Sequence, residues 1–288
     1  MSIRLDTVIG HAKAGHEVTP DQYEPELTID EQPVDHSISS LMTGFQLSVA
    51  AGLGNRIGVD LALPVRVTVL EADFHNDLGD SVEPDSIHHR DEVIAGLGDL
   101  ELGFRFGLLR PSEVPRLSLD LRVGLSFPTG HVEEDPYVLG AKGIRHVHTF
   151  FGQGAFLPQL GLELDFDVPA GHLLLGGDGQ LSLYEGEKGY LPPSFGSFWL
   201  GFASNYGVPW LTLSVRHVLY VESESFWNGV TAENSGRTDL SFDVATEFAL
   251  GAGVAVGAMV KGTYATVTNG GDLSSPWLVG LSVSWTRQ

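Results

Sequence analysis

The chain contains no cysteine among its 288 residues, which excludes disulfide bonds and metal sites built on thiolates. It also has no apolar run approaching the ~18 consecutive residues of a membrane-spanning helix. Basic residues are scarce, with 16 Lys and Arg against 37 Asp and Glu. The resulting net charge of -21 argues against a nucleic-acid partner, because phosphate backbones repel an acidic protein surface.

The chain is instead rich in glycine, with 36 residues, and in period-2 alternation of apolar and polar side chains. In GLGDLELGFRFGLL (96–109), leucine and phenylalanine occupy even positions, and most odd positions are charged or glycine. This alternation is typical of a strand with one apolar and one polar face. No amphipathic helix pattern is comparably strong. We expect strands near 2–10, 41–51, 57–71, 96–109, 116–127, 156–168, 173–185, 197–206, 210–222, 238–250, 253–267 and 277–285.

The connections between these segments alternate in length. Short turns are predicted at 53–56, 110–115, 169–172, 207–209 and 251–253. Long polar segments are predicted at 11–36, 74–92, 128–147, 186–196, 223–237 and 268–276. Short turns at one end and long loops at the other are the layout of an outer-membrane barrel. The sequence therefore predicts an all-β fold, a closed antiparallel up-and-down transmembrane β-barrel of about twelve strands. We expect residues 1–288 to form one such domain in the bacterial outer membrane.

Alternation alone does not decide which face points inward. The apolar face forms the core of a soluble sandwich or ligand-binding barrel, whereas it meets lipid in a membrane barrel. The regular loop asymmetry favours lipid, and so does the last strand, GLSVSW (280–285), which resembles the C-terminal assembly signal of outer-membrane barrels. Aromatic residues near strand ends are the third indication. The expected lipid-interface aromatics are Phe127, Tyr206, Trp210, Tyr220, Trp277 and Trp285.

Two short motifs carry a family resemblance. GLGDLELGFRF (96–106) and the later LSFPTG (125–130) resemble the outer-membrane proteins of the MetA pathway of phenol degradation, a family of proposed transporters. Their pattern is G-x-G-D opening one strand and S-L-P-T-G closing the next, with Phe127 here in place of leucine. The resemblance covers roughly the middle third of the chain. It implies transport of small aromatic or other hydrophobic compounds, and it brings no catalytic residue and no cofactor.

Charged side chains on the polar faces are expected to line the lumen. Acidic groups outnumber basic ones, and because a buried unpaired charge is costly, these groups must be hydrated or paired. We expect a channel or transporter that passes small polar solutes with a weak cation preference. The alternative is a salt-bridged, plugged barrel that docks a partner protein. The expected lumen-lining residues are Arg66, Asp99, Glu101, Arg105, Arg116, Asp120, Arg122, Glu163, Asp165, Asp167, Arg216, Arg237, Asp239, Asp243, Glu247 and Lys261.

Histidines and carboxylates gather in the long polar segments. His88, His89, His146 and His148 are candidates for a divalent metal site there. The simpler interpretation is an acidic hydrated surface that faces lipopolysaccharide and its bridging cations. The expected partners are outer-membrane lipid, lipopolysaccharide, small solutes, divalent cations at the acidic loops and, for a docking barrel, a protein.

An outer-membrane hydrolase is the third alternative. Nucleophilic hydrolysis needs a serine beside a histidine that a third group orients. HSISS (36–40) and HTF (148–150) place hydroxyls near histidine in sequence, but no G-x-S-x-G motif is present. We therefore do not expect an enzyme.

Overall fold

The computed structural model describes residues 1–18, 34–76, 78–81, 90–232, 234–269 and 273–287, and it is built of β-strands. No helix in these ranges is long and apolar enough to cross a membrane. The elements are β1 (Ser2–Val18), β2 (Val34–Gly52), β3 (Ile57–Asn76), β4 (Glu92–Leu97), β5 (Leu100–Leu109), β6 (Leu117–Phe127), α1 (Pro136–Gly140), β7 (Leu157–Val168), β8 (Gly171–Gln180), β9 (Tyr190–Leu191), β10 (Phe195–Ser204), β11 (Leu211–Glu222), β12 (Phe226–Trp227), β13 (Val230–Thr231), β14 (Arg237–Gly251), β15 (Val254–Thr268) and β16 (Ser274–Thr286).

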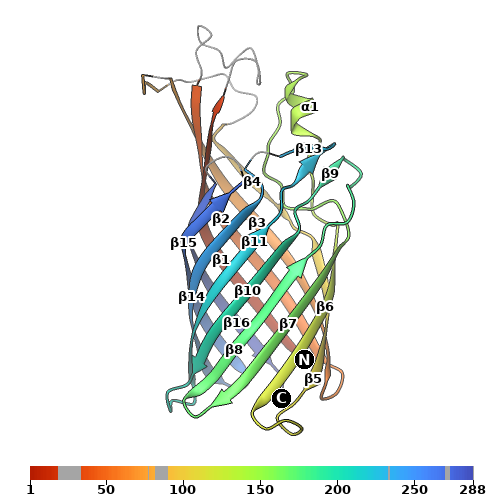
Figure 1. Cartoon of the computed structure of the whole chain (residues 1–288), viewed down its shortest axis with the longest axis vertical. Helices are drawn as coiled ribbons and strands as arrows, with labels where there is room; N and C mark the ends of the chain where they lie inside the picture. The colour runs from red at the N-terminus through yellow and green to blue at the C-terminus, as the bar shows by residue number, and fades with distance from the viewer. Residues whose placement is uncertain (19–33, 77, 82–89, 233, 270–272, 288) are drawn as a thin grey trace.

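The large sheet closes on itself. β1 pairs with β2 on one side and with β16 on the other, and β2 pairs in turn with β3. Twelve antiparallel strands thus form a complete ring, and β4 is a thirteenth strand that pairs with β3. Figure 1 shows the short turns and both termini toward the lower end, with α1 and the small strands at the upper end. The predicted fold class and strand number are confirmed.

The stretch 96–109 departs from the single strand predicted for it. It divides into β4, which pairs with the upper part of β3, and β5, which pairs with the lower part. The division falls at Gly98 and Asp99, beside Pro64 of β3. Pro64 has no N–H to donate to the ladder, and a Cβ on Gly98 would lie 2.8 Å from its ring. A proline and a glycine in register therefore interrupt the pairing.

The predicted loops 11–36 and 74–92 are too long, since strands extend into both. β1 continues to Val18 and β2 begins at Val34, and the two stay paired to those ends. β3 continues to Asn76 and β4 begins at Glu92. Above the membrane both faces of a strand meet water, so the apolar–polar alternation that reveals a strand fades. In Figure 1 these strands rise above the rest of the ring.

An internal cavity identifies the inward face of the wall. It has a volume of about 320 Å³ and is lined from β1, β8, β10, β11, β14, β15 and β16, which span half of the ring. Charged side chains from strands that are not neighbours, such as Arg4 and Glu247, can share one cavity only when they point inward. Some residues of the other parity, such as Leu281, also border the cavity. The lining includes Arg4, Asp6, Leu174, Ala203, Ser214, Ala245, Glu247, Met259 and Ser282. On each strand these residues alternate with the apolar residues of the other face.

The outward face is apolar and exposed. Leu160, Phe198 and Leu281 are 58–61% exposed, and many valines and leucines of the same parity resemble them. A water-soluble protein does not expose so continuous an apolar surface. The outward face therefore meets lipid, as the sequence predicts.

Leu162 gives a direct test of this assignment. It lies on the outward face of β7, opposite Leu121 of β6. Leu162→Arg should destabilise the barrel by about 2–4 kcal/mol, because it places a charge in hydrocarbon. Urea titration of the barrel refolded in lipid vesicles measures this cost. Gln159→Arg on the inward face of the same strand is the matched control, and equal costs for the two variants would contradict the assignment.

Candidate functional site

The inward face carries nearly all the charged residues expected in the lumen. Cross-strand partners share one face of the sheet, and so do residues two positions apart along a strand. Following these relations from strand to strand connects the charged residues to the cavity-lining positions, so they point the same way. Arg116 differs, because it precedes β6, is exposed and has a φ of 67° in the turn. Asp99 also lies outside the strands. The inward strand positions are Arg66, Glu101, Arg105, Asp120, Arg122, Glu163, Asp165, Asp167, Arg216, Arg237, Asp239, Asp243, Glu247 and Lys261.

A glycine on the inward face makes room for an ion pair between two strands that are not neighbours. Arg122 of β6 donates to Asp60 of β3 at 2.8 Å, across the intervening β5. The Asp60 carboxylate lies directly over Gly103 of β5, where a Cβ would approach it to 2.6 Å. A larger residue at position 103 would therefore displace this pair.

Opposite charges also alternate around the ring. Lys261, Asp243 and Arg216 are consecutive cross-strand partners on β15, β14 and β11. On β8, Asp178 interacts electrostatically with both Arg122 and Arg216. Opposite charges on neighbouring strands reduce the cost of holding these groups inside a narrow barrel.

Tyr220 is not the lipid-interface aromatic that the sequence suggested. It has the same parity on β11 as Arg216, so it lies on the inward face. Its hydroxyl donates to Glu222, and the Arg237 guanidinium lies 5.4 Å from its ring centroid. Strand parity, which already placed Arg216 in the lumen, contained the signal for this residue.

The other predicted aromatics lie near strand ends or in turns. Trp277 and Trp285 are near opposite ends of β16, and Trp277 stacks on His11. Phe127 ends β6 and meets Phe156 edge-on, with ring centroids 5.8 Å apart. Tyr206 and Trp210 lie in the turn between β10 and β11, where Trp210 stacks on Phe248. Interface girdles require such positions.

Asp99 joins the wall to residues 128–156, called here the inner segment. Its side chain is 6% exposed, and it accepts hydrogen bonds from the backbone N–H groups of Gly130 (2.9 Å) and Gln153 (2.8 Å). Beside it, the Thr129 hydroxyl accepts from the Leu100 N–H at 2.9 Å. One carboxylate therefore ties both ends of the inner segment to the break between β4 and β5. We call this arrangement the Asp99 joint.

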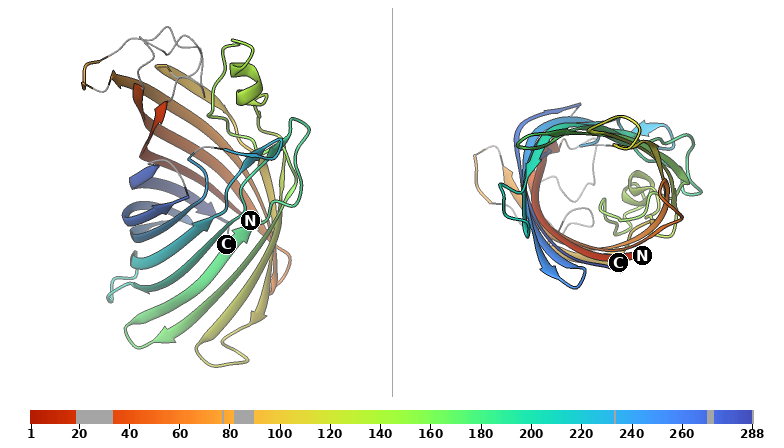
Figure 2. Two further views of the ribbon diagram at one scale, coloured as in Figure 1. Left: turned by 45° about the horizontal axis from the view of Figure 1, so that its top comes forward. Right: turned by 90° about the horizontal axis from the view of Figure 1, so that it is seen from below.

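The inner segment lies against the inward face of the wall. Gly96 pairs with Arg66, so its missing side chain leaves space on that face. Phe151 occupies the space, because a Cβ on Gly96 would lie 3.1 Å from its ring. Viewed along the barrel, the part that carries α1 projects inside the ring (Figure 2, right). The inner segment therefore narrows the upper mouth.

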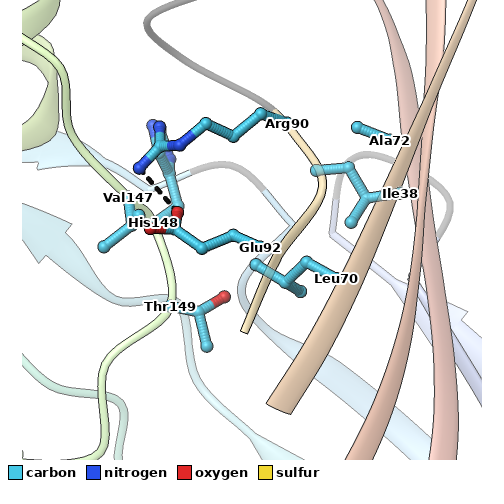
Figure 3. A pocket seen from close by; sticks show the side chains of 8 residues that line it. All are labelled: Ile38, Leu70, Ala72, Arg90, Glu92, Val147, His148 and Thr149. Carbon is cyan, nitrogen blue, oxygen red and sulfur yellow. Dashed lines mark ion pairs between the residues drawn. The ribbon is translucent and has the colours of Figure 1, made fainter. Parts of the chain in front are cut away.

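A small pocket separates the inner segment from the wall (Figure 3). Ile38, Leu70 and Ala72 form one side, and Val147, His148 and Thr149 form the other. Arg90 pairs with Glu92 at 2.6 Å beside this pocket, and it also donates to the His146 carbonyl at 3.1 Å. These contacts add a second attachment of the inner segment to the wall.

Above the mouth, the inner segment packs on the small sheet of β9, β12 and β13. Val132, Tyr190 and Trp227 are buried together, and Phe150 packs against them. We call these four residues the cap cluster. The Phe150 ring lies edge-on to the rings of Tyr190 and Trp227. Burial raises the pKa of Tyr190 to about 12. The upper loops thus have a hydrophobic core of their own.

Only half of the predicted histidine metal site lies in the described part of the chain. His88 and His89 lie outside the described residues. His146 is 1% exposed, its Nδ1 bonds the Ile144 carbonyl at 2.8 Å, and its ring packs on His148. Among the described residues, the group of three close ligating side chains is Asp165, Asp167 and His172. His172 was not among the sequence candidates, because its carboxylate neighbours lie on another strand.

A serine–histidine contact does occur, between Ser39 Oγ and His11 Nε2 at 3.0 Å. His11 stacks on Trp277. Within the described ranges, no carboxylate forms an ion pair with His11. Among the described residues, this contact thus consists of a serine and a histidine without a paired carboxylate.

Comparison with known proteins supports the fold. No family model matches the sequence, and no curated protein is similar to it. The COG4313 outer membrane channel from Pseudomonas putida F1 is similar in structure, with a TM-score of 0.61 and 12% identity over 99% of this chain and 95% of that one. The chain is an outer-membrane β-barrel.

Two further structures are less similar. The transport unit of the autotransporter AIDA-I from Escherichia coli has a TM-score of 0.48 and 5% identity, over 99% of this chain and 90% of that one. The P. putida toluene transporter TodX has a TM-score of 0.43 and 9% identity, over 100% and 89%. Both likenesses are too weak to support an argument.

Removing the Asp99 carboxylate should release the inner segment. Asp99→Ala leaves two backbone N–H groups without their charged acceptor, a cost of about 2–4 kcal/mol. We expect hydrogen exchange at Gly130 and Gln153 to accelerate while the barrel strands stay protected. Asp91→Ala is the matched control, because Asp91 accepts one exposed backbone bond, from Ala72. Unchanged exchange at both amides in Asp99→Ala would contradict the Asp99 joint.

Proposed function

We propose that the protein is a channel that passes small polar solutes across the outer membrane. One observation carries this proposal: the inward face of a closed barrel holds charged side chains and encloses a cavity of about 320 Å³. A purely structural wall needs no such charged interior, since charges held away from water are costly. Hydrated charges along a passage instead select what passes through it.

The charge balance supports a preference for cations. The inward strand positions hold more carboxylates than basic groups, and several basic groups, such as Arg122 and Arg216, face acidic neighbours. Glu247 and Asp6 both line the internal cavity. A net negative passage concentrates cations and repels anions.

Membership of the MetA-pathway family is part of the proposal, and the Asp99 joint supports it. The two motifs that carry the resemblance meet there, because Asp99 of GLGD bonds Gly130 of LSFPTG. The family implies small aromatic or hydrophobic solutes, whereas the inward charges favour small polar ones. We therefore propose polar solutes as the main cargo.

We also propose that residues 1–288 form one domain, because strands from both ends of the chain pair in one sheet.

The inner segment favours a second candidate, a plugged barrel that docks a partner protein. The Asp99 joint and the Phe151 contact hold this segment in the mouth, and the cap cluster gives the upper loops an ordered surface. Such a barrel would insert into lipid without conducting ions. Lipid and lipopolysaccharide are proposed partners in both cases, and divalent cations at the acidic upper loops are a further one.

Single-channel recording in a planar bilayer separates the two candidates. Under a salt gradient we expect discrete conductance steps and a reversal potential on the cation-selective side, because the inward face is net acidic. Insertion without conductance would overturn the channel proposal and favour the plugged barrel. Liposome swelling with neutral and cationic solutes then ranks the cargo.

Charge-neutralising variants test where the selectivity arises. The double variant Asp178→Asn, Asp243→Asn removes two inward carboxylates, so the reversal potential should move toward zero. Glu113→Gln removes a carboxylate from the exposed turn between β5 and β6 and serves as the control. If the double variant keeps the reversal potential of the unaltered channel, these carboxylates do not set its selectivity.

A further inference from the structure

We propose that Asp165, Asp167 and His172 bind one divalent transition-metal ion at the short-turn mouth of the barrel. Asp165 and Asp167 occupy alternate positions of β7, so both lie on the inward face. His172 of β8 is the cross-strand partner of Asp167. One ligand atom from each of the three residues lies within 4.8 Å of the others.

In this group two carboxylates share one imidazole nitrogen. His172 Nδ1 lies 2.8 Å from Asp167 Oδ1 and 3.1 Å from Asp165 Oδ1. One ring nitrogen carries at most one proton, so it cannot donate a full hydrogen bond to both carboxylates. Within the described ranges, neither carboxylate forms an ion pair with an arginine or lysine. A bound cation would satisfy all three atoms at once.

The donor set selects the class of metal. One imidazole nitrogen and two carboxylate oxygens suit zinc and related divalent transition ions, whereas calcium and magnesium prefer oxygen alone. Ligand atoms around tetrahedral zinc lie about 3.4 Å apart, given bond lengths of about 2.1 Å. The two nitrogen–oxygen separations, 2.8 and 3.1 Å, are shorter than this value, so the side chains would move apart slightly to admit an ion. Water would complete the coordination, since the three side chains are between one-third and one-half exposed.

The backbone around the site is already fixed. Only Pro169 and Ala170 separate β7 from β8, and Val168 pairs with Gly171 beside them. Gly171 has a φ of 150°, and a Cβ there would collide with the Ala203 carbonyl of β10. The strands therefore hold the three ligands in place before any ion arrives, which lowers the entropic cost of binding.

Calorimetric titration of the purified full-length barrel in detergent with zinc chloride tests the site. We expect one high-affinity zinc per chain. Loss of supporting residues around metal sites already weakens binding by about 10- to 100-fold. Asp167→Asn and His172→Gln each remove a direct ligand, so each should weaken this binding step by at least about tenfold. Cobalt gives a second readout, because its visible spectrum reports a nitrogen–oxygen site directly.

Asp178→Asn is the matched control, because it removes the same charge from the same face of β8, outside the group. It should retain the high-affinity step, and this separates the site from weak binding to the other histidines among the chain's 11. Heat-modifiable gel mobility checks that every variant is folded. Absence of a high-affinity step in the unaltered protein would overturn the proposal, as would its persistence in both ligand variants. Neither result depends on whether the barrel conducts.

Discussion

The pairing of β1 with β16 is the constraint on which the rest of the structure depends. Hydrocarbon offers no water to satisfy backbone N–H and C=O groups, so a sheet in a membrane cannot leave an edge. Closing the ring satisfies these groups and divides every strand into an inward and an outward face. Apolar side chains on one face and polar ones on the other then follow from alternation.

Space on the inward face decides where further structure can form. Gly103 lets the Asp60 and Arg122 side chains meet across a strand, and Gly96 lets Phe151 reach the wall. These glycines lie on opposite sides of the break between β4 and β5. The lower glycine accommodates an ion pair, and the upper glycine accommodates the inner segment. The inward face of the wall therefore contacts different groups at different heights.

The fold brings the two sequence motifs into contact with each other. GLGD places Asp99 at the break, and LSFPTG places Thr129 and Gly130 within reach of it. The resemblance therefore rests on residues that attach a loop to a wall, rather than on residues that contact a solute.

The sequence alone determined the barrel, its strand number, the positions of its short turns and the face that meets lipid. Period-2 alternation and turn residues are local signals, and they suffice because each strand lies between lipid and a polar interior. These local signals failed above the membrane. There both faces of β1, β2 and β3 meet water, so the sequence of a strand resembles that of a loop. Only the tertiary structure brought His172 to Asp165 and Asp167, or Asp99 to Gly130 and Gln153. Those contacts depend on the register between strands and on a loop that folds against the inside of the wall. Neither can be predicted from a local sequence pattern.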